Sequence, residues 1–346
     1  MSRVRLYLDR SPGETRGVLT LAGRPHRLLI QRDDDPDTAG LGRRYIARVA
    51  RLDRGLASAF LDLGGEAQAM MALSGEAKSL VEGGSVEVEI AAEARRDKLA
   101  LARLIGAGQG PARVLTAPRS VAQRLQALAP DQPLTEGREA RDAADQAEAE
   151  VLAIEHPLPG GGSVAIQPTR ALIAIDVDLG ARAGDVRRIA RQANLTALDM
   201  AARLLRLKGL AGLVVIDLVG SGHDGAALTQ AAKAAFAPDE PGVGLGPLSR
   251  FGLLQIAVPW RVQPLAERLC DPAGVLTPAT AALRLLRALE REGRADGGAR
   301  LLGRCAPLAA QAAASYIPAL TQSLGARFEI CPDPTLRLDQ MEVSSQ

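Results

Sequence analysis

The chain has 346 residues, and 47% of them are hydrophobic, which excludes general disorder and allows two to four modules. A net charge of +2 gives no bulk electrostatic attraction to nucleic acid. Three scattered cysteines, Cys270, Cys305 and Cys331, form neither a disulfide framework nor a zinc tetrad. The start lacks the apolar core of a signal peptide, and no apolar run reaches the roughly 18 residues that span a bilayer. We therefore expect a cytoplasmic protein without a membrane segment.

Strand patterns dominate the first third of the chain. Residues 1–35 alternate in strand fashion around glycine turns, and residues 36–42 are a turn-rich break. From Arg43 to about Leu104, short strand-like runs and glycines predict a small barrel. Basic residues gather in this stretch, among them Arg43, Arg44, Arg48, Arg51 and Arg54. A run of charges of this kind is usually a solvent-exposed face.

Helical patterns occur in the middle and near the end of the chain. Between proline-rich breaks, the sequence predicts helices over residues 121–128 and 139–154. Further on, residues 277–294 predict a helix, residues 309–324 a second helical stretch, and residues 328–330 a strand.

Two short apolar runs are the most informative part of the sequence. Residues 173–178 read Ile-Ala-Ile-Asp-Val-Asp and residues 213–218 read Leu-Val-Val-Ile-Asp-Leu. A cationic helix of about two dozen residues joins them. This order predicts a βαβ unit of buried parallel strands.

Three acids belong to these runs. Asp176 and Asp178 point to the same face of an extended strand, and Asp217 comes alongside if the two strands are neighbours. Because a carboxylate is costly to bury without a cation or donors, acids that converge where a parallel sheet ends indicate a hard-cation site, such as one for Mg²⁺. The alternative is that they cap helices or pair with nearby arginines, namely Arg182, Arg187 and Arg188.

The sequence around these runs resembles a known family. Residues 160–178 are similar to the "GGSIVID-TEAL-IDVN" core of the RNase E/G endoribonucleases. Dense matches in one order over roughly a hundred residues are far more specific than a single loop motif. The likeness is strongest at 160–256 and weakest at 111–155, and its further matches are Asn194-Leu195 and residues 201–207, 212–217 and 248–254.

The resemblance implies a multidomain α/β (α+β) fold. An OB-fold RNA-binding barrel at residues 37–107 would be inserted in a split ribonuclease H-like layer, with strands at 1–36 and helices at 108–155. A DNase I-like catalytic α/β domain at 156–268 and a small C-terminal α/β domain at 275–346 would follow. Longer family members carry a sensor for the 5′-phosphate of RNA, and the short segment before the catalytic core implies that this sensor is absent.

The resemblance also implies the catalytic residues. It assigns the metal-binding acids to Asp176 and Asp217. Asp178 completes the catalytic set, at the position where the family has Asn, and an extra carboxylate there would tighten cation binding. Arg170 departs from the family, which has Glu at that position. His223 follows Asp217 by six residues, but the family pattern does not require it.

RNA-binding residues follow from the same comparison. Phe60 takes the place of the family's base-stacking Phe, Met70 replaces its second aromatic residue, and Lys98 falls on its basic position. Without the family pattern, Phe60 would be expected in the barrel core. Arg48 and Arg250 are the further residues expected to contact RNA.

The implied function is Mg²⁺-dependent hydrolysis of single-stranded RNA by an endoribonuclease, with Mn²⁺ as the alternative ion. Ala273 stands where the family has a second zinc-binding cysteine beside Cys270, so no zinc is expected and any homodimer would rest on packing. A catalytically weakened RNA-binding relative is the alternative, favoured by Arg170 and Met70. A nucleotide-dependent enzyme is disfavoured because no glycine-rich phosphate loop follows a strand.

Overall fold

The computed structural model describes residues 4–35, 39–95, 98–181, 185–221, 224–239 and 242–345 of a mixed α/β chain. Its contacts divide the chain into two compact units. Unit 1 gathers Met1–Thr38, Arg119–Gln146 and Leu265–Gln346, and unit 2 gathers Ala39–Pro118 and Ala147–Pro264. Among the helices of the described ranges, none is both long and apolar enough to cross a membrane. The finer five-part division stays a prediction.

A four-stranded sheet forms the first half of unit 1, with the strand order β10-β1-β2-β3. Helix α1 packs on it so closely that a Cβ on Gly17 of β2 would lie 2.5 Å from Val121. The helix begins with a capping box, in which Ser120 and Gln123 each accept a hydrogen bond from the other's backbone N–H. The elements are β1 (Val4–Ser11), β2 (Glu14–Leu21), β3 (Arg24–Arg32), α1 (Val121–Leu128), β10 (Leu134–Thr135) and α2 (Arg138–Leu152), whose residues from Ala147 on are counted in unit 2.

The second half of unit 1 is a three-stranded sheet, in the order β18-β17-β19, packed on helices. Its elements are α5 (Leu265–Leu269), α6 (Pro278–Ala295), β17 (Leu301–Cys305), α7 (Pro307–Ala313), α8 (Ile317–Leu324), β18 (Phe328–Pro332) and β19 (Met341–Ser345). The helix expected at 277–294 is therefore confirmed as α6. The stretch expected at 309–324 is two helices, separated by a 3₁₀ turn at Ala314–Tyr316, because Pro318 has no N–H to continue the ladder.

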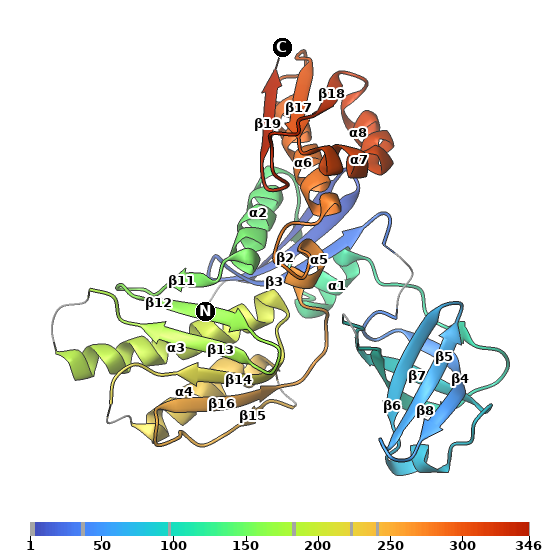
Figure 1. Ribbon diagram of the computed structural model, residues 1–346, viewed down its shortest axis with the longest axis vertical. Coiled ribbons are helices and arrows are strands. Elements are labelled where there is room, and N and C mark those ends of the chain that lie inside the picture. Colours follow the sequence, from blue (N-terminus) through green and yellow to red (C-terminus); the bar gives the residue numbers. More distant parts are fainter. Residues whose placement is uncertain are drawn as a thin grey trace. The chain divides into compact units, whose positions relative to one another are not determined.

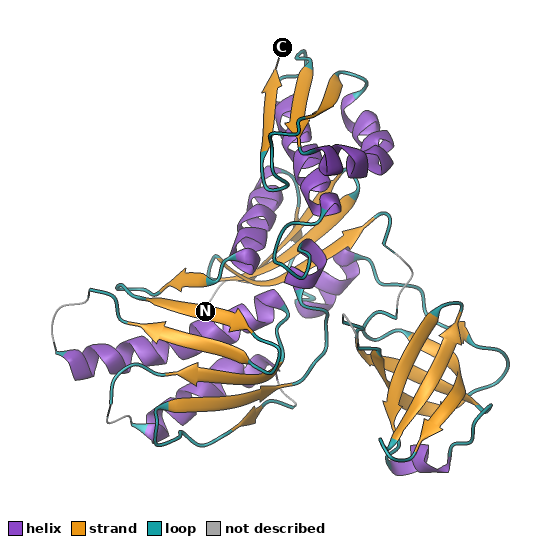
Figure 2. Cartoon of the chain, in the orientation of Figure 1, coloured by secondary structure: helices purple, strands orange, loops and turns teal. Residues whose placement is uncertain are grey.

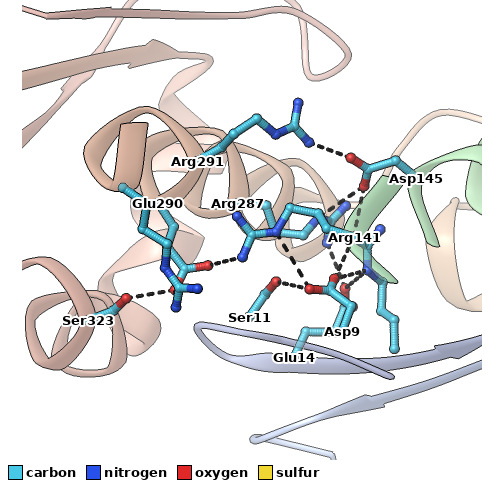
Figure 3. A network of polar contacts seen from close by, with 11 residues as sticks. Asp9, Ser11, Glu14, Arg141, Asp145, Arg287, Glu290, Arg291 and Ser323 are labelled. Atoms are coloured by element: carbon cyan, nitrogen blue, oxygen red, sulfur yellow. Dashed lines mark hydrogen bonds and ion pairs between the residues drawn. The ribbon is translucent and has the colours of Figure 1, made fainter. Parts of the chain in front are cut away.

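Buried ion pairs hold the parts of unit 1 together (Figure 3). Arg16 of β2 is completely buried, and its Nη2 donates to Asp9 Oδ2 of β1 at 2.6 Å and to Asp145 Oδ1 of α2 at 2.8 Å. Arg287 of α6 reaches Glu14 Oε2 of β2 at 2.6 Å. Because each of these buried charges has a partner of opposite sign, removing one partner would leave an uncompensated charge in the interior.

A closed barrel of OB-like topology forms one part of unit 2. The strand order is β5-β6-β8-β7-β4, and pairing of β5 with β4 closes the ring. The core is aliphatic, with Val49, Leu61 and Ile90 each at most 1% exposed. The elements are β4 (Arg44–Asp53), β5 (Ser58–Gly64), β6 (Ala67–Ala72), the 3₁₀ helix η1 (Gly75–Ser79), β7 (Ser85–Ala92), β8 (Ala100–Ala107) and the added strand β9 (Arg113–Val114).

The other part of unit 2 is a six-stranded mixed sheet in the order β11-β12-β13-β14-β16-β15. Strands β13 and β14 are parallel neighbours joined by helix α3, which confirms the expected βαβ unit. The elements are β11 (Glu155–Pro157), β12 (Ser163–Pro168), β13 (Ile173–Asp178), α3 (Val186–Lys208), β14 (Gly212–Asp217), α4 (Gly225–Phe236), the 3₁₀ helix η2 (Ala237–Asp239), β15 (Gly244–Leu245) and β16 (Leu253–Val258).

Only one face of this mixed sheet is covered. Helices α3 and α4 lie behind it in Figure 1, and Figure 2 shows the same layering by element type. Ile173, Ile175 and Val177 of β13 are buried against the helices, whereas Asp176 and Asp178 are exposed. The expectation of fully buried parallel strands is thus wrong for one face. We call the uncovered side the open face.

Candidate active site

Two carboxylates meet on the open face. Asp176 of β13 and Asp217, the last residue of β14, are partners in the parallel register. Neighbouring strands lie about 4.8 Å apart, so the two side chains start from adjacent positions. Asp178 is exposed on the same side of β13, two residues further on, and its Oδ1 accepts from the N–H of Gly180 at 3.0 Å. Asp176 and Asp217 are therefore neighbours across the two strands, as the sequence predicts for adjacent strands.

The alternative that these acids cap the neighbouring helices does not hold, because other acids do so. Asp185 caps α3, its Oδ1 accepting from the N–H groups of Arg187 and Arg188 at 3.0 and 3.3 Å. Asp224 caps α4 by accepting from the N–H of Ala227. Within the described ranges, no hydrogen bond or ion pair ties Asp176 or Asp217 to another side chain. Both carboxylates are thus available to a ligand. Arg182 and His223 lie outside the described residues.

The pair suits a hard cation that keeps part of its water shell. Carboxylate oxygens are the ligands that Mg²⁺ takes, usually one or two from the protein with water and phosphate oxygens for the rest. In the part of the chain that the structure describes, no three His, Cys, Asp or Glu side chains gather closely enough to hold an ion, so the expected three-acid cluster is not formed. The register pair Asp176–Asp217 is what remains of that expectation, with Asp178 two residues further along β13.

Two backbone anchors fix the loops beside these acids. Asn194 of α3 is 1% exposed, and its amide donates to the carbonyl of Val219 at 3.0 Å and accepts from the N–H of Val219 at 3.1 Å. This pins the segment that follows Asp217. On the neighbouring strand, Ser249 shapes the turn that precedes β16 and carries Arg250. Arg250 is exposed, as its expected role requires.

A row of outward-facing side chains crosses the barrel. Phe60 of β5 pairs with Met70 of β6, which pairs with Leu101 of β8. On the other side, Arg51 of β4 is in register with Phe60, and its guanidinium lies 4.1 Å from the ring centroid. Phe60 is not part of the barrel core. The row Arg51–Phe60–Met70–Leu101 is called the barrel platform below; a base could stack on it.

The remaining predicted RNA contacts are also at the surface. Arg48 is exposed on β4 and lines a cavity of about 460 Å³ together with Asp62 and Glu82. Lys98 is exposed in the turn that precedes β8. Arg170 is exposed in the turn between β12 and β13. Sequence reasoning assigned no role to Leu101, because its place beside Met70 depends on the parallel pairing of distant strands.

Two buried basic groups occupy the β11 edge of the mixed sheet. Lys208, the last residue of α3, is 5% exposed and donates to the carbonyls of Glu150, Val151 and Ala153 at 2.5–2.9 Å. Burial lowers the pKa of Lys208 to about 8. His156 of β11 is 4% exposed, and burial together with the charge of Lys208 lowers its pKa to about 4. His156 is therefore neutral at pH 7.

Fold and site together define an α/β protein with an OB-like barrel and a carboxylate pair on an open sheet face. Residues 116–258, which include all of that sheet but not the barrel, match the model of the Ribonuclease E/G family. This region of the chain is similar to the Ribonuclease E/G family, which confirms the resemblance recognised from the sequence.

Curated relatives agree with this assignment. Over 104 residues, 29% of this chain, it is 39% identical to Ribonuclease E of Haemophilus influenzae and 38% identical to Ribonuclease E of Escherichia coli (strain K12). Over 112 residues it is 30% identical to the chloroplastic Ribonuclease E/G-like protein of Arabidopsis thaliana, covering 31% of this chain. The match spans about a tenth of the length of these relatives, between 10% and 11%.

Proposed function

We propose that this protein is an endoribonuclease that cleaves single-stranded RNA with the help of a divalent cation. The observation that carries the proposal is the register pair Asp176–Asp217, exposed on the open face inside the segment that matches the Ribonuclease E/G family. The similarity to relatives named Ribonuclease E supports the reaction class. The expected products are a 5′-phosphate and a 3′-hydroxyl end.

The chain's own residues would act on the scissile phosphate as follows. When bound, Mg²⁺ or Mn²⁺ supplies charge neutralisation at the phosphate and an activated water. Asp176 and Asp217 would hold the ion, and Asp178 would add a third negative charge that strengthens its retention. Arg250, in the turn before β16, binds a neighbouring phosphate and positions the strand. The barrel platform holds unpaired bases, with Arg48 and Lys98 as further contacts to the phosphate backbone.

The finer architecture also belongs to this proposal. We infer that the mixed sheet of unit 2 is the DNase I-like catalytic domain and that the β1–β3 sheet is part of the ribonuclease H-like layer. We further propose that any homodimer forms by packing and without zinc, since Ala273 cannot serve as a zinc ligand beside Cys270.

Substitution of the carboxylate pair tests the function directly. Asp176→Asn and Asp217→Asn should each abolish cleavage of a 5′-labelled, AU-rich single strand in Mg²⁺, because each removes one anionic oxygen ligand. RNA affinity, set largely by the barrel, should change little. The matched control is Asp199→Asn, an exposed acid of α3, which should cleave at the wild-type rate.

Three results would contradict the proposal. If either variant cleaves at the wild-type rate, the carboxylate pair is not the catalytic site. Equal cleavage with a chelator present would exclude the cation. If the wild-type protein binds the strand but does not cut it with Mg²⁺ or Mn²⁺, the protein is instead the RNA-binding relative.

A further inference from the structure

The turn between β15 and β16 is held in shape by one hydroxyl group. Ser249 Oγ accepts hydrogen bonds from the N–H of Phe251 at 3.2 Å and from the N–H of Leu253 at 3.1 Å. The Ser249 N–H donates to the carbonyl of Leu253 at 2.9 Å. Gly252 follows with φ of +83°, the left-handed region that favours glycine. The backbone therefore fixes the direction in which Phe251 projects.

This turn presents an aromatic ring to solvent. Phe251 is 72% exposed, the largest value among the large hydrophobic side chains of the described residues. Arg250 places its guanidinium 4.7 Å from the centroid of the Phe251 ring. The other three phenylalanines are all described, and each is partly or fully buried: Phe60, Phe236 and Phe328. An aromatic ring and a cation are thus displayed together, outside any core.

The exposed ring is next to the carboxylate pair along the sheet. Leu253 is in register with Asp217, and the N–H of Leu218 donates to the carbonyl of Gly252 at 3.3 Å. Phe251 is two residues from Leu253 along the turn, so their Cα atoms are at most about 7 Å apart. The turn that carries the ring therefore adjoins the end of β14 that carries Asp217.

We propose that Phe251 and Arg250 form a stacking subsite for one unpaired nucleobase beside the scissile phosphate, an inference that rests on the proposed function. The base stacks on the ring, and the guanidinium binds a flanking phosphate. Asp176 and Asp217 repel RNA phosphates, and a cation with an apolar platform next to them offsets that repulsion. Because every base has a π-face, the subsite accepts any unpaired base but not one held in a duplex.

The experiment measures RNA binding apart from cleavage. A fluorescently labelled single strand is titrated with protein in chelator, so that the RNA stays uncut, and anisotropy gives the affinity. Phe251→Leu keeps an apolar side chain but loses the π-face, and should weaken binding about fivefold or more. Phe251→Tyr keeps the ring and should bind within about twofold of wild type. The control Leu308→Ala, at a residue 56% exposed in unit 1, should have no effect.

The outcomes separate this inference from the proposed catalysis. Weaker binding by Phe251→Leu, with rescue by Phe251→Tyr, supports the subsite even if the wild-type protein cuts no RNA. Wild-type binding and cleavage by Phe251→Leu overturn the subsite and leave the catalysis standing. If Phe251→Leu alters only the sedimentation of the protein and not its RNA affinity, the ring is a contact between copies of the chain and the inference is overturned.

Discussion

At the scale of single residues, the open face shows that exposure matters as much as identity. Asp176 and Asp217 are acids at strand ends, as are many acids that only cap helices. Asp176 and Asp217 differ from such acids because they cap no helix: Asp185 caps α3 and Asp224 caps α4. The pair therefore contributes charge to solvent without a structural partner in the described chain, which suits a cation-binding role.

The buried histidine gives a prediction about pH. The folded-state pKa of His156 is about 4, below the unfolded value of 6.5, so the unfolded chain binds more protons in between. The free energy of unfolding should therefore rise with pH from about 4 to 6.5, with His156 contributing at most about 3 kcal/mol. His156→Gln does not titrate and should flatten this rise in urea unfolding. His26→Gln is the control; an unchanged slope in His156→Gln would contradict the assignment.

At the scale of elements, the barrel platform gives a prediction about RNA binding. Phe60→Ala should weaken binding of a single strand by about 1–3 kcal/mol, the usual contribution of one stacked base. The melting transition should survive, because Phe60 lies outside the barrel core. Val114→Ala, an exposed apolar residue of β9 outside the platform, serves as the control. If Phe60→Ala loses the folded barrel, Phe60 is a core residue and the stacking role is contradicted.

Local patterns predicted the elements well and the faces poorly. Helix α1 was expected at its observed bounds and α2 and α6 nearly so, because apolar spacing and caps such as Ser120 are local signals. Helix α3 was expected only as a helix of about two dozen residues between the two strands. The break between α7 and α8 was not predicted, although Pro318, which lacks a backbone N–H, is a local signal for it. The open face could not be predicted, since whether a sheet face is covered depends on packing that no single strand encodes.

The candidate site divided in the same way. Acids two apart on one strand were predictable from alternation, and the register of Asp176 with Asp217 followed once the strands were neighbours. Leu101 and Phe251 were not predictable. The place of Leu101 depends on the pairing of β6 with β8. The exposure of Phe251 depends on the shape of the turn that carries it. Phe251 offered one signal, as an aromatic residue in a chain that is 2% aromatic.

At the scale of the whole molecule, the ion pairs of unit 1 predict where stability resides. Arg16→Met should lower the free energy of unfolding by about 3–5 kcal/mol, because Asp9, 3% exposed, would lose its closest cation. Arg5→Met is the matched control, since the Arg5–Glu139 pair is exposed and should contribute little. Urea unfolding of both variants measures the difference. Similar midpoints for the two would show that burial adds nothing to these pairs.

The same ion pairs set an order of events during synthesis. Asp9 and Glu14 leave the ribosome early, but Arg287 and Glu290, which complete the network, follow some 270 residues later. Unit 2 uses nothing beyond Pro264, so all of its chain is available first. Until α6 emerges, Glu14 lacks Arg287 and Arg141 lacks Glu290, although Arg16 can already pair with Asp9 and Asp145. A chain interrupted before α6 would therefore carry the carboxylate pair and the barrel but only part of the ion-pair network of unit 1.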